Sequence, residues 1–172
     1  AGHLASWTID GVEQLLEPPT DNFVRAPLDN DIGSSQAGKP SPHSWLGRWE
    51  QAGLFDLEHR CLSVTRDDAE QQLKVEHGYF RGNVMMLSST WQYAFGADGD
   101  MHVEVNVAVA EDAPPLPRVG MSMQLVADPG TIAWTGRGPH ENYPDRKHSA
   151  DMGNWSLATE DMHTPYIFPS EN

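Results

Sequence analysis

Valine occupies every second position from residue 103 to residue 109, and this alternation restricts the fold more than any other feature of the chain. The neighbouring positions carry the polar residues His102, Glu104 and Asn106. Because successive side chains of a β-strand point to opposite faces of a sheet, the pattern predicts a strand with one apolar and one polar face.

The same period of two recurs in four other segments, at residues 55–64, 73–79, 91–95 and 119–125. Strands with one apolar face are typical of antiparallel sheets whose other face meets water. The 13 Pro and 15 Gly interrupt the sequence too often for long helices. We therefore predict an all-β fold, in which antiparallel sheets pack as a sandwich. At 172 residues the chain can form a single domain, spanning residues 1–172.

Two local elements have signals of their own. Apolar runs on either side of the pair Asp10-Gly11 are typical of a β-hairpin with a type I′ turn. One short helix is predicted near residues 43–52, where Ser44 is a favourable N-cap and Gly53 a favourable C-terminal stop. Its apolar residues have helical spacing and are Trp45, Leu46, Trp49 and Ala52.

The net charge of −14 argues against two classes of partner. Nucleic acids and anionic membrane surfaces are bound through clustered basic residues, and the chain has only 11 Lys and Arg, with no run of them. No segment reaches the ~20 apolar residues of a membrane span. The single Cys61 cannot form an intramolecular disulfide and suits a reducing compartment, so we expect a cytoplasmic protein.

A dense polar motif, Arg-Ala-Pro-Leu-Asp-Asn-Asp-Ile-Gly, occupies residues 25–33. Its two carboxylates, Asp29 and Asp31, could share a strand face, and retaining glycoside hydrolysis needs two carboxylates ~5–5.5 Å apart. We prefer a structural role, in which the aspartates hold a turn through backbone N–H groups and an ion pair with Arg25. Residues 33–42 are mostly small, polar or proline and predict a mobile surface loop.

A second polar motif, Gly-Arg-Gly-Pro-His-Glu-Asn-Tyr-Pro-Asp-Arg, occupies residues 136–146. Glu141 and Asp145, together with His140, are its candidate catalytic groups. The arginines that flank them would lower the carboxylate pKa values, which is the opposite of what acid catalysis requires. We expect a buried polar network here in preference to a ligand site.

The histidines show no metal signature. Six of them are scattered through the sequence with no pair at helical spacing: His59, His77, His102, His140, His148 and His163. His102 and Glu104 share a strand face, but such a face is solvated more often than it is a site. We therefore predict no metal site in this chain.

Tryptophan rings are a third kind of candidate, because a flat ring suits the apolar face of a sugar. Trp45 and Trp49 fit the packing of the helix on a sheet. The core is expected to contain Trp7, Trp91 and Trp134. Trp155 is the least committed, although a place in the core or at its rim is the preferred interpretation.

With the closing Tyr-Ile-Phe-Pro-Ser-Glu-Asn at residues 166–172, the two polar motifs resemble the C-terminal small-chain domain of the large bacterial β-galactosidases, which are glycoside hydrolases of the retaining type. The resemblance extends over nearly the whole chain. It implies an antiparallel β-supersandwich similar in fold to galactose mutarotases, of which these residues are a part. Open strand edges in such a part would recruit other chains, so self-association is expected.

The resemblance also implies an accessory role. In the family, the catalytic carboxylates and the Mg²⁺ and Na⁺ ions belong to a (β/α)8 barrel, which has no counterpart in this sequence. The small-chain domain completes the galactoside pocket with a mobile loop that maps onto Gly33, Ser34 and Ser35. The chain alone is expected to be inactive and to need the remaining domains of an enzyme that hydrolyses terminal β-galactosides such as lactose. Seven motif residues are expected to form a structural framework: Arg25, Asp29, Asp31, Glu141, Tyr143, Asp145 and Arg146.

Two alternatives remain open. A free-standing sugar-binding or aldose-mutarotase-like module needs a His and a Glu that converge in one cleft, and His102/Glu104 and His140/Glu141 are the candidate pairs. A purely structural or interaction domain needs no such pair.

Overall fold

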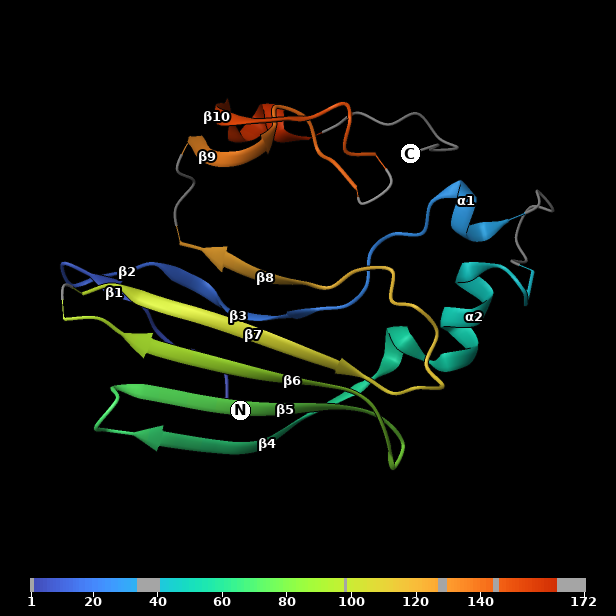
Figure 1. Cartoon of the computed structure of the whole chain (residues 1–172), viewed down its shortest axis with the longest axis horizontal. Helices are drawn as coiled ribbons and strands as arrows, with labels where there is room; N and C mark the ends of the chain where they lie inside the picture. The colour runs from blue at the N-terminus through green and yellow to red at the C-terminus, as the bar shows by residue number, and fades with distance from the viewer. Residues whose placement is uncertain (1, 34–40, 98, 127–129, 144–145, 164–172) are drawn as a thin grey trace. The chain divides into compact units, whose positions relative to one another are not determined.

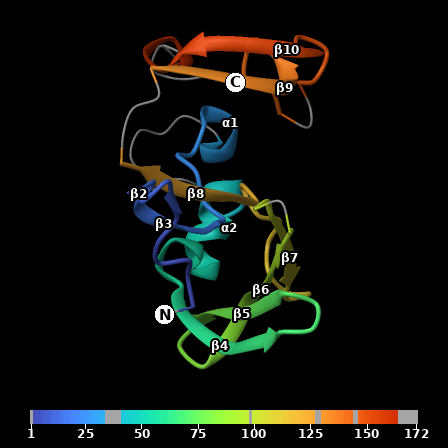
Figure 2. The same cartoon turned by 90° about the vertical axis from the view of Figure 1, so that its left-hand side faces the viewer.

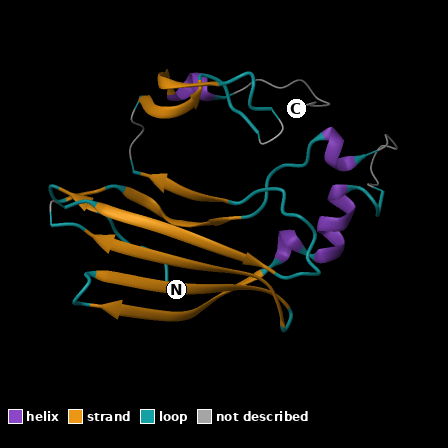
Figure 3. Ribbon diagram, in the orientation of Figure 1, coloured by secondary structure: helices purple, strands orange, loops and turns teal. Residues whose placement is uncertain are grey.

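The computed structural model describes residues 2–33, 41–97, 99–126, 130–143 and 146–163. Most of these residues lie in antiparallel strands, with few helical turns between them (Figure 3). The described chain divides into two compact units, one ending at Gln124 and one beginning at Leu125. The elements in chain order are β1 Thr8–Ile9, β2 Val12–Glu13, β3 Leu15–Asn22, α1 Asp29–Ile32, α2 Trp45–Ala52, the 3₁₀ helix η1 Leu54–Asp56, β4 Glu58–Asp67, β5 Gln72–Arg81, β6 Val84–Phe95, β7 Met101–Val109, β8 Gly120–Leu125, β9 Thr131–Gly138, β10 Asp151–Ala158 and the 3₁₀ helix η2 Thr159–Met162.

The first unit is built around an antiparallel meander of four strands in the order β4-β5-β6-β7 (Figure 1). Its central pairing places Val75 opposite Trp91 and Trp91 opposite Val105. The alternation of apolar and polar residues creates the buried face, where Val75 and Trp91 are only 2% and 1% exposed. The prediction of an all-β antiparallel fold is therefore confirmed.

Strands β3 and β8 pair with each other in a separate two-stranded sheet (Figures 1 and 2). Their apolar side chains and those of β6 and β7 line a common hollow of about 450 Å³. The hollow lies between two sheet faces, as in a sandwich, but it is not filled by the described residues. Met121 and Met123 on β8 remain 45% and 43% exposed.

A second part of the core lies where helix α2 meets the meander. It consists of Phe23, Trp49, Leu54, Tyr79, Met86 and Leu87. The predicted helix is confirmed at both ends. Ser44 Oγ accepts a hydrogen bond from the Gly47 N–H at 3.1 Å, and Gly53 ends the helix in the left-handed conformation at φ 70°.

The predicted hairpin is confirmed as β1–β2, with Ile9 opposite Val12. Asp10 and Gly11 both have positive φ, at 51° and 79°, as a type I′ turn requires. Trp7, just before β1, is 38% exposed, so its prediction as a core residue is wrong. The hairpin is only two residues long on each side and has no broad apolar surface to cover the ring.

The second unit contains the antiparallel hairpin β9–β10, in which Trp134 lies opposite Trp155. Both tryptophans are half-buried, so the expectation of a core position for Trp134 is only partly met. The Trp155 indole leaves no room for a side chain at Gly138, where an added Cβ would lie 2.6 Å from the ring. Its Nε1–H donates to Gly136 O at 3.1 Å, so the ring packs against its own hairpin.

Candidate functional site

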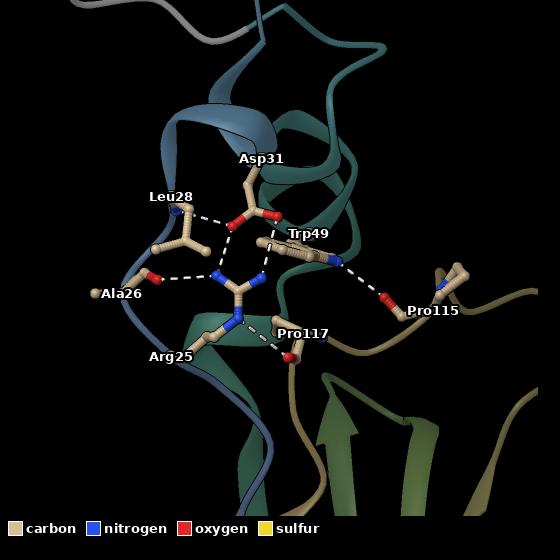
Figure 4. Close-up of polar contacts among 7 residues, drawn as sticks. All are labelled: Arg25, Ala26, Leu28, Asp31, Trp49, Pro115 and Pro117. Carbon is tan, nitrogen blue, oxygen red and sulfur yellow. Dashed lines mark hydrogen bonds and ion pairs between the residues drawn. The ribbon is translucent and has the colours of Figure 1, made fainter. Parts of the chain in front are cut away.

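The polar motif at residues 25–33 folds around one ion pair (Figure 4). Arg25 Nη1 donates to Asp31 Oδ2 at 2.5 Å, and Nη2 donates to Oδ1 at 3.2 Å. The Asp31 side chain is 9% exposed, and Oδ2 also accepts the backbone N–H of Leu28 at 2.8 Å. Because the pair is bidentate and largely shielded from water, it fixes the orientation of the short helix α1.

The two aspartates of the motif have different surroundings. They lie on the single turn of α1 and not on a strand, so residues two apart do not share a face. Among the described residues, the Asp29 carboxylate has no hydrogen-bond or ion-pair partner. Asp29 and Asp31 therefore do not form the pair of facing carboxylates that retaining glycoside hydrolysis needs.

Arg25 also connects α1 to distant parts of the chain. Its Nε donates to Pro117 O at 3.2 Å, and its guanidinium lies 5.7 Å from the centre of the Trp49 ring on α2. Trp49 Nε1 in turn donates to Pro115 O at 2.9 Å (Figure 4). We call Arg25, Asp31, Trp49, Pro115 and Pro117 the anchor, because they join α1, α2 and the segment before β8.

Gly33 leaves the anchor in a conformation open only to glycine. Its φ of 75° and ψ of −164° fall in a region that L residues avoid. An added Cβ would also lie 3.2 Å from Ser44 Cβ. The chain is described again from Ser41, which crosses α2 so closely that a Cβ at Gly47 would lie 2.2 Å from Ser41 O. Both ends of the intervening segment are thus held against α2; Ser34 and Ser35 lie outside the described residues.

The second motif, in the second unit, is more exposed than the sequence suggested. Glu141 Oε1 accepts from Arg146 Nη2 at 3.3 Å, and the two side chains are 36% and 40% exposed. The Arg146 guanidinium lies 5.4 Å from the centre of the Tyr143 ring. The expected burial of this network is therefore wrong for Glu141; Asp145 lies outside the described residues.

The two His/Glu pairs proposed for a free-standing module are also exposed. His102 and Glu104 lie on the solvated face of β7, where Glu104 accepts a hydrogen bond from Asn106 at 2.8 Å. His140 and Glu141 lie on the surface after β9. Neither pair has the shielded surroundings that would tune a proton donor and acceptor.

A polar cluster on the buried side of the meander has no signal in the local sequence. Asp21 accepts hydrogen bonds from Tyr79 Oη at 2.6 Å, from Trp91 Nε1 at 3.0 Å and from Ser89 Oγ. Burial, and then the bond to Asp21, raise the pKa of the Tyr79 hydroxyl. Beside this cluster lie three histidines from separate segments, which the sequence gives no reason to bring together: His3, His59 and His77. The register of β4 against β5, which brings two of them together, is not readable from local sequence.

The family profile described as "Beta galactosidase small chain" matches residues 1–172. The chain belongs to this family. A β-galactosidase of Aeromonas hydrophila is 43% identical over 100% of the chain, and one of Yersinia pestis (strain Angola) is 47% identical over 99% of it. A β-galactosidase of Yersinia pseudotuberculosis is also 47% identical. The chain spans only 17% and 16% of the length of the Aeromonas and Yersinia pestis relatives.

The match to the β-galactosidase small-chain family covers the whole chain. The first and second motifs both lie within the match. Within the described residues, no helix is both long and apolar enough to cross a membrane.

Proposed function

We propose that this chain is an accessory domain of a β-galactosidase and supplies a loop and a wall of its galactoside pocket. The observation that supports the loop role best is the geometry of Gly33. Gly33 adopts a backbone conformation reserved for glycine, and it follows directly after α1, which the shielded ion pair of Asp31 with Arg25 holds in place. The backbone of Gly33 and the ion pair of Asp31 together set the direction in which the chain leaves α1.

The anchor would serve catalysis by positioning. Gly33 and Ser41, which flank the proposed loop, both lie close to α2, so the base of the proposed loop has a rigid support, as in lids over active sites. In the proposed pocket the segment that begins at Gly33, with Ser34 and Ser35, would contact the sugar and exclude water. Such contacts contribute through orientation and through the removal of solvent from the reacting groups.

The acid/base and the nucleophile of the proposed retaining reaction would come from the barrel domain of the parent enzyme. Mg²⁺ and Na⁺ are likewise assigned to that domain. The described residues do not fit either ion, because hard cations select oxygen ligands, whereas the one described cluster of three possible ligands holds only imidazole nitrogens. We therefore expect no turnover by the chain alone, in an assay of the pure chain with a chromogenic galactoside.

The partly open hollow supports the further proposal that other domains of the enzyme cover this face. Apolar residues of β7 and β8 that line it are more than a third exposed, including Val105, Met121 and Met123. Exposed apolar surface of this kind marks contact sites. Without its partners the chain would self-associate, which sedimentation velocity at rising concentration would detect.

With Cys61 as its single cysteine, the protein is best suited to the reducing cytoplasm.

Substitution Gly33→Ala in the full-length enzyme tests the loop role. Alanine is strained at φ +75° and its Cβ would lie close to Ser44, so the chain would leave α1 in another direction. We expect kcat/KM for a galactoside to fall by about 10- to 100-fold, as misplacement of binding groups by about 1 Å can do.

The matched control is Gly82→Ala in the turn between β5 and β6. Gly82 also has a positive φ, of 60°, but nothing lies within 4 Å of its added Cβ. Alanine at position 82 therefore introduces a side chain at a positive φ without contacting the anchor. Equal kcat/KM values for the two variants would refute the loop role and favour a purely structural domain.

A further inference from the structure

Three imidazole rings meet on the β4–β5 side of the meander. His59 lies on β4, His77 lies on β5, and His3 belongs to the segment before β1. One nitrogen of each ring lies within 4.8 Å of the corresponding nitrogens of the other two. The rings of His3 and His77 are stacked, with centres 4.9 Å apart and planes at 13°.

The N-terminal segment reaches this position because residue 2 is glycine. An added Cβ at Gly2 would lie 2.7 Å from Cys61 Sγ and 2.9 Å from His77 Cε1. Gly2 also has a φ of 84°, which favours glycine. The chain therefore lies directly on β4 and β5 at this point, and the next residue, His3, faces the other two rings.

The cluster contains a buried nitrogen without a partner. His77 is 1% exposed, and among the described residues its Nε2 has no hydrogen-bond partner. Its Nδ1 lies 2.9 Å from His59 Nε2. Buried polar atoms in native proteins are almost always satisfied, so an unpaired one beside two other rings calls for an explanation.

The surroundings lower the pKa of all three rings, which favours their neutral form. Burial, and then the neighbouring His3 and His59, lower the pKa of His77 to about 4. Burial also lowers the pKa of His3 and of His59. Neutral imidazole has a free lone pair, which is the form that binds metal ions.

A negative charge lies nearby. The carboxylate of Asp21 acts on all three rings and favours a positive charge among them. Asp21 is itself held by three hydrogen bonds, from Tyr79, Ser89 and Trp91. The site thus combines nitrogen donors with a fixed anionic neighbour, whose charge favours a bound cation.

We propose that His3, His59 and His77 bind one divalent transition-metal ion of the zinc class. Ligands of a tetrahedral ion at ~2.0–2.1 Å lie about 3.3 Å from one another. The observed nitrogens are within 4.8 Å, so small ring rotations bring them to that spacing. Imidazole selects zinc, copper or nickel over Mg²⁺ and Ca²⁺, and a water molecule would take the fourth position. A bound ion would tie the N-terminal segment to two strands of the meander.

Metal-binding measurements on the full polypeptide that contains these residues test the proposal. The protein is prepared without a polyhistidine tag, stripped with a chelator and titrated with Zn²⁺ in a calorimeter. Co²⁺ absorption in the visible range then reports the coordination. The informative variant is His3→Ala, because this residue lies outside the sheet and is only half-buried, so the fold is expected to persist. His59→Ala and His77→Ala complete the set.

Two variants serve as matched controls. His102→Ala removes an exposed imidazole on β7, and Cys61→Ser removes the thiol that lies opposite His77 on the neighbouring strand. We expect wild type and both controls to bind the same number of Zn²⁺ ions. Each ligand variant should weaken one site by at least about tenfold, since even outer-shell partners contribute roughly 10- to 100-fold.

Two results would overturn the proposal. If a folded His3→Ala protein binds Zn²⁺ with unchanged stoichiometry and affinity, the three rings are only a packing cluster. If Cys61→Ser loses the site as well, the ligand set is not three imidazoles. A Co²⁺ spectrum of octahedral type, identical in wild type and His3→Ala, would count against the proposal equally.

Discussion

The two polar motifs look alike in sequence, yet their folded surroundings differ. Each places an arginine near acidic residues, prolines and glycines. In the first, Arg25 and Asp31 are 23% and 9% exposed; their hydrogen bonds reach Leu28 in the same motif and Pro117, and the Arg25 guanidinium lies 5.7 Å from the centre of the Trp49 ring. In the second, Arg146 and Glu141 are 40% and 36% exposed and make one ion pair of 3.3 Å. The residue types therefore indicate where a polar junction lies, whereas its burial decides how strongly the junction fixes the chain.

Substitution Asp31→Ala should give the largest effect. It leaves the partly buried Arg25 guanidinium without its counter-charge and removes the acceptor of the Leu28 N–H. We expect the free energy of unfolding to fall by about 2–3 kcal/mol, measured by urea denaturation followed by circular dichroism. Asp29→Ala, two residues away on the same helical turn, should change it by less than about 0.5 kcal/mol. Equal losses would mean that the anchor does not depend on the ion pair.

Substitution Trp49→Phe should give an intermediate effect. It removes the hydrogen bond to Pro115 O and leaves that carbonyl oxygen unpaired at a position where the ring is 3% exposed. We expect a loss of about 1–2 kcal/mol in the same assay. The matched control is Trp45→Phe on the same helix, where the ring is 42% exposed and the loss should stay below about 0.5 kcal/mol. A larger loss for Trp45 would reverse the assignment of the buried face.

Substitution Glu141→Gln should give the smallest effect. An exposed ion pair contributes little, because water and salt screen it, so we expect less than about 0.5 kcal/mol. Thermal unfolding at low and high salt checks this, and wild type and variant should behave alike. A loss above about 2 kcal/mol would show that the second motif is as shielded as the first, and the contrast between the motifs would disappear.

Local signals in the sequence predicted the local elements. Alternating apolar residues identified the strands from β4 to β8, although Phe55, predicted to begin the first of them, lies in the 3₁₀ helix η1 and β4 begins only at Glu58. Ser44 and Gly53 predicted the ends of α2, and Asp10-Gly11 predicted the first hairpin. Each of these features depends on residues within a few positions of one another, so backbone preference and side-chain direction are sufficient to find them.

Features that depend on distant residues were not predicted. The ion pair of Arg25 with an aspartate of the motif was expected, but the hydrogen bond from Arg25 to Pro117 O, 92 residues away, was not. His59 and His77 come together through the pairing of β4 with β5, which includes an irregularity between Cys61 and Ser63, and His3 joins them from the segment before β1. A shift of one residue in that register would turn His59 to the other face. No local pattern contains this information.

The hollow between the β3–β8 pair and strands β6 and β7 has a practical consequence for anyone who handles the chain. Its walls are mostly hydrocarbon and thioether, chiefly from valine, methionine and tryptophan side chains. The fluorescence of a hydrophobic dye should therefore increase when the dye binds the properly folded chain. Such an increase is normally interpreted as a sign of misfolding. Quality control of this protein should rest on cooperative unfolding and not on dye emission.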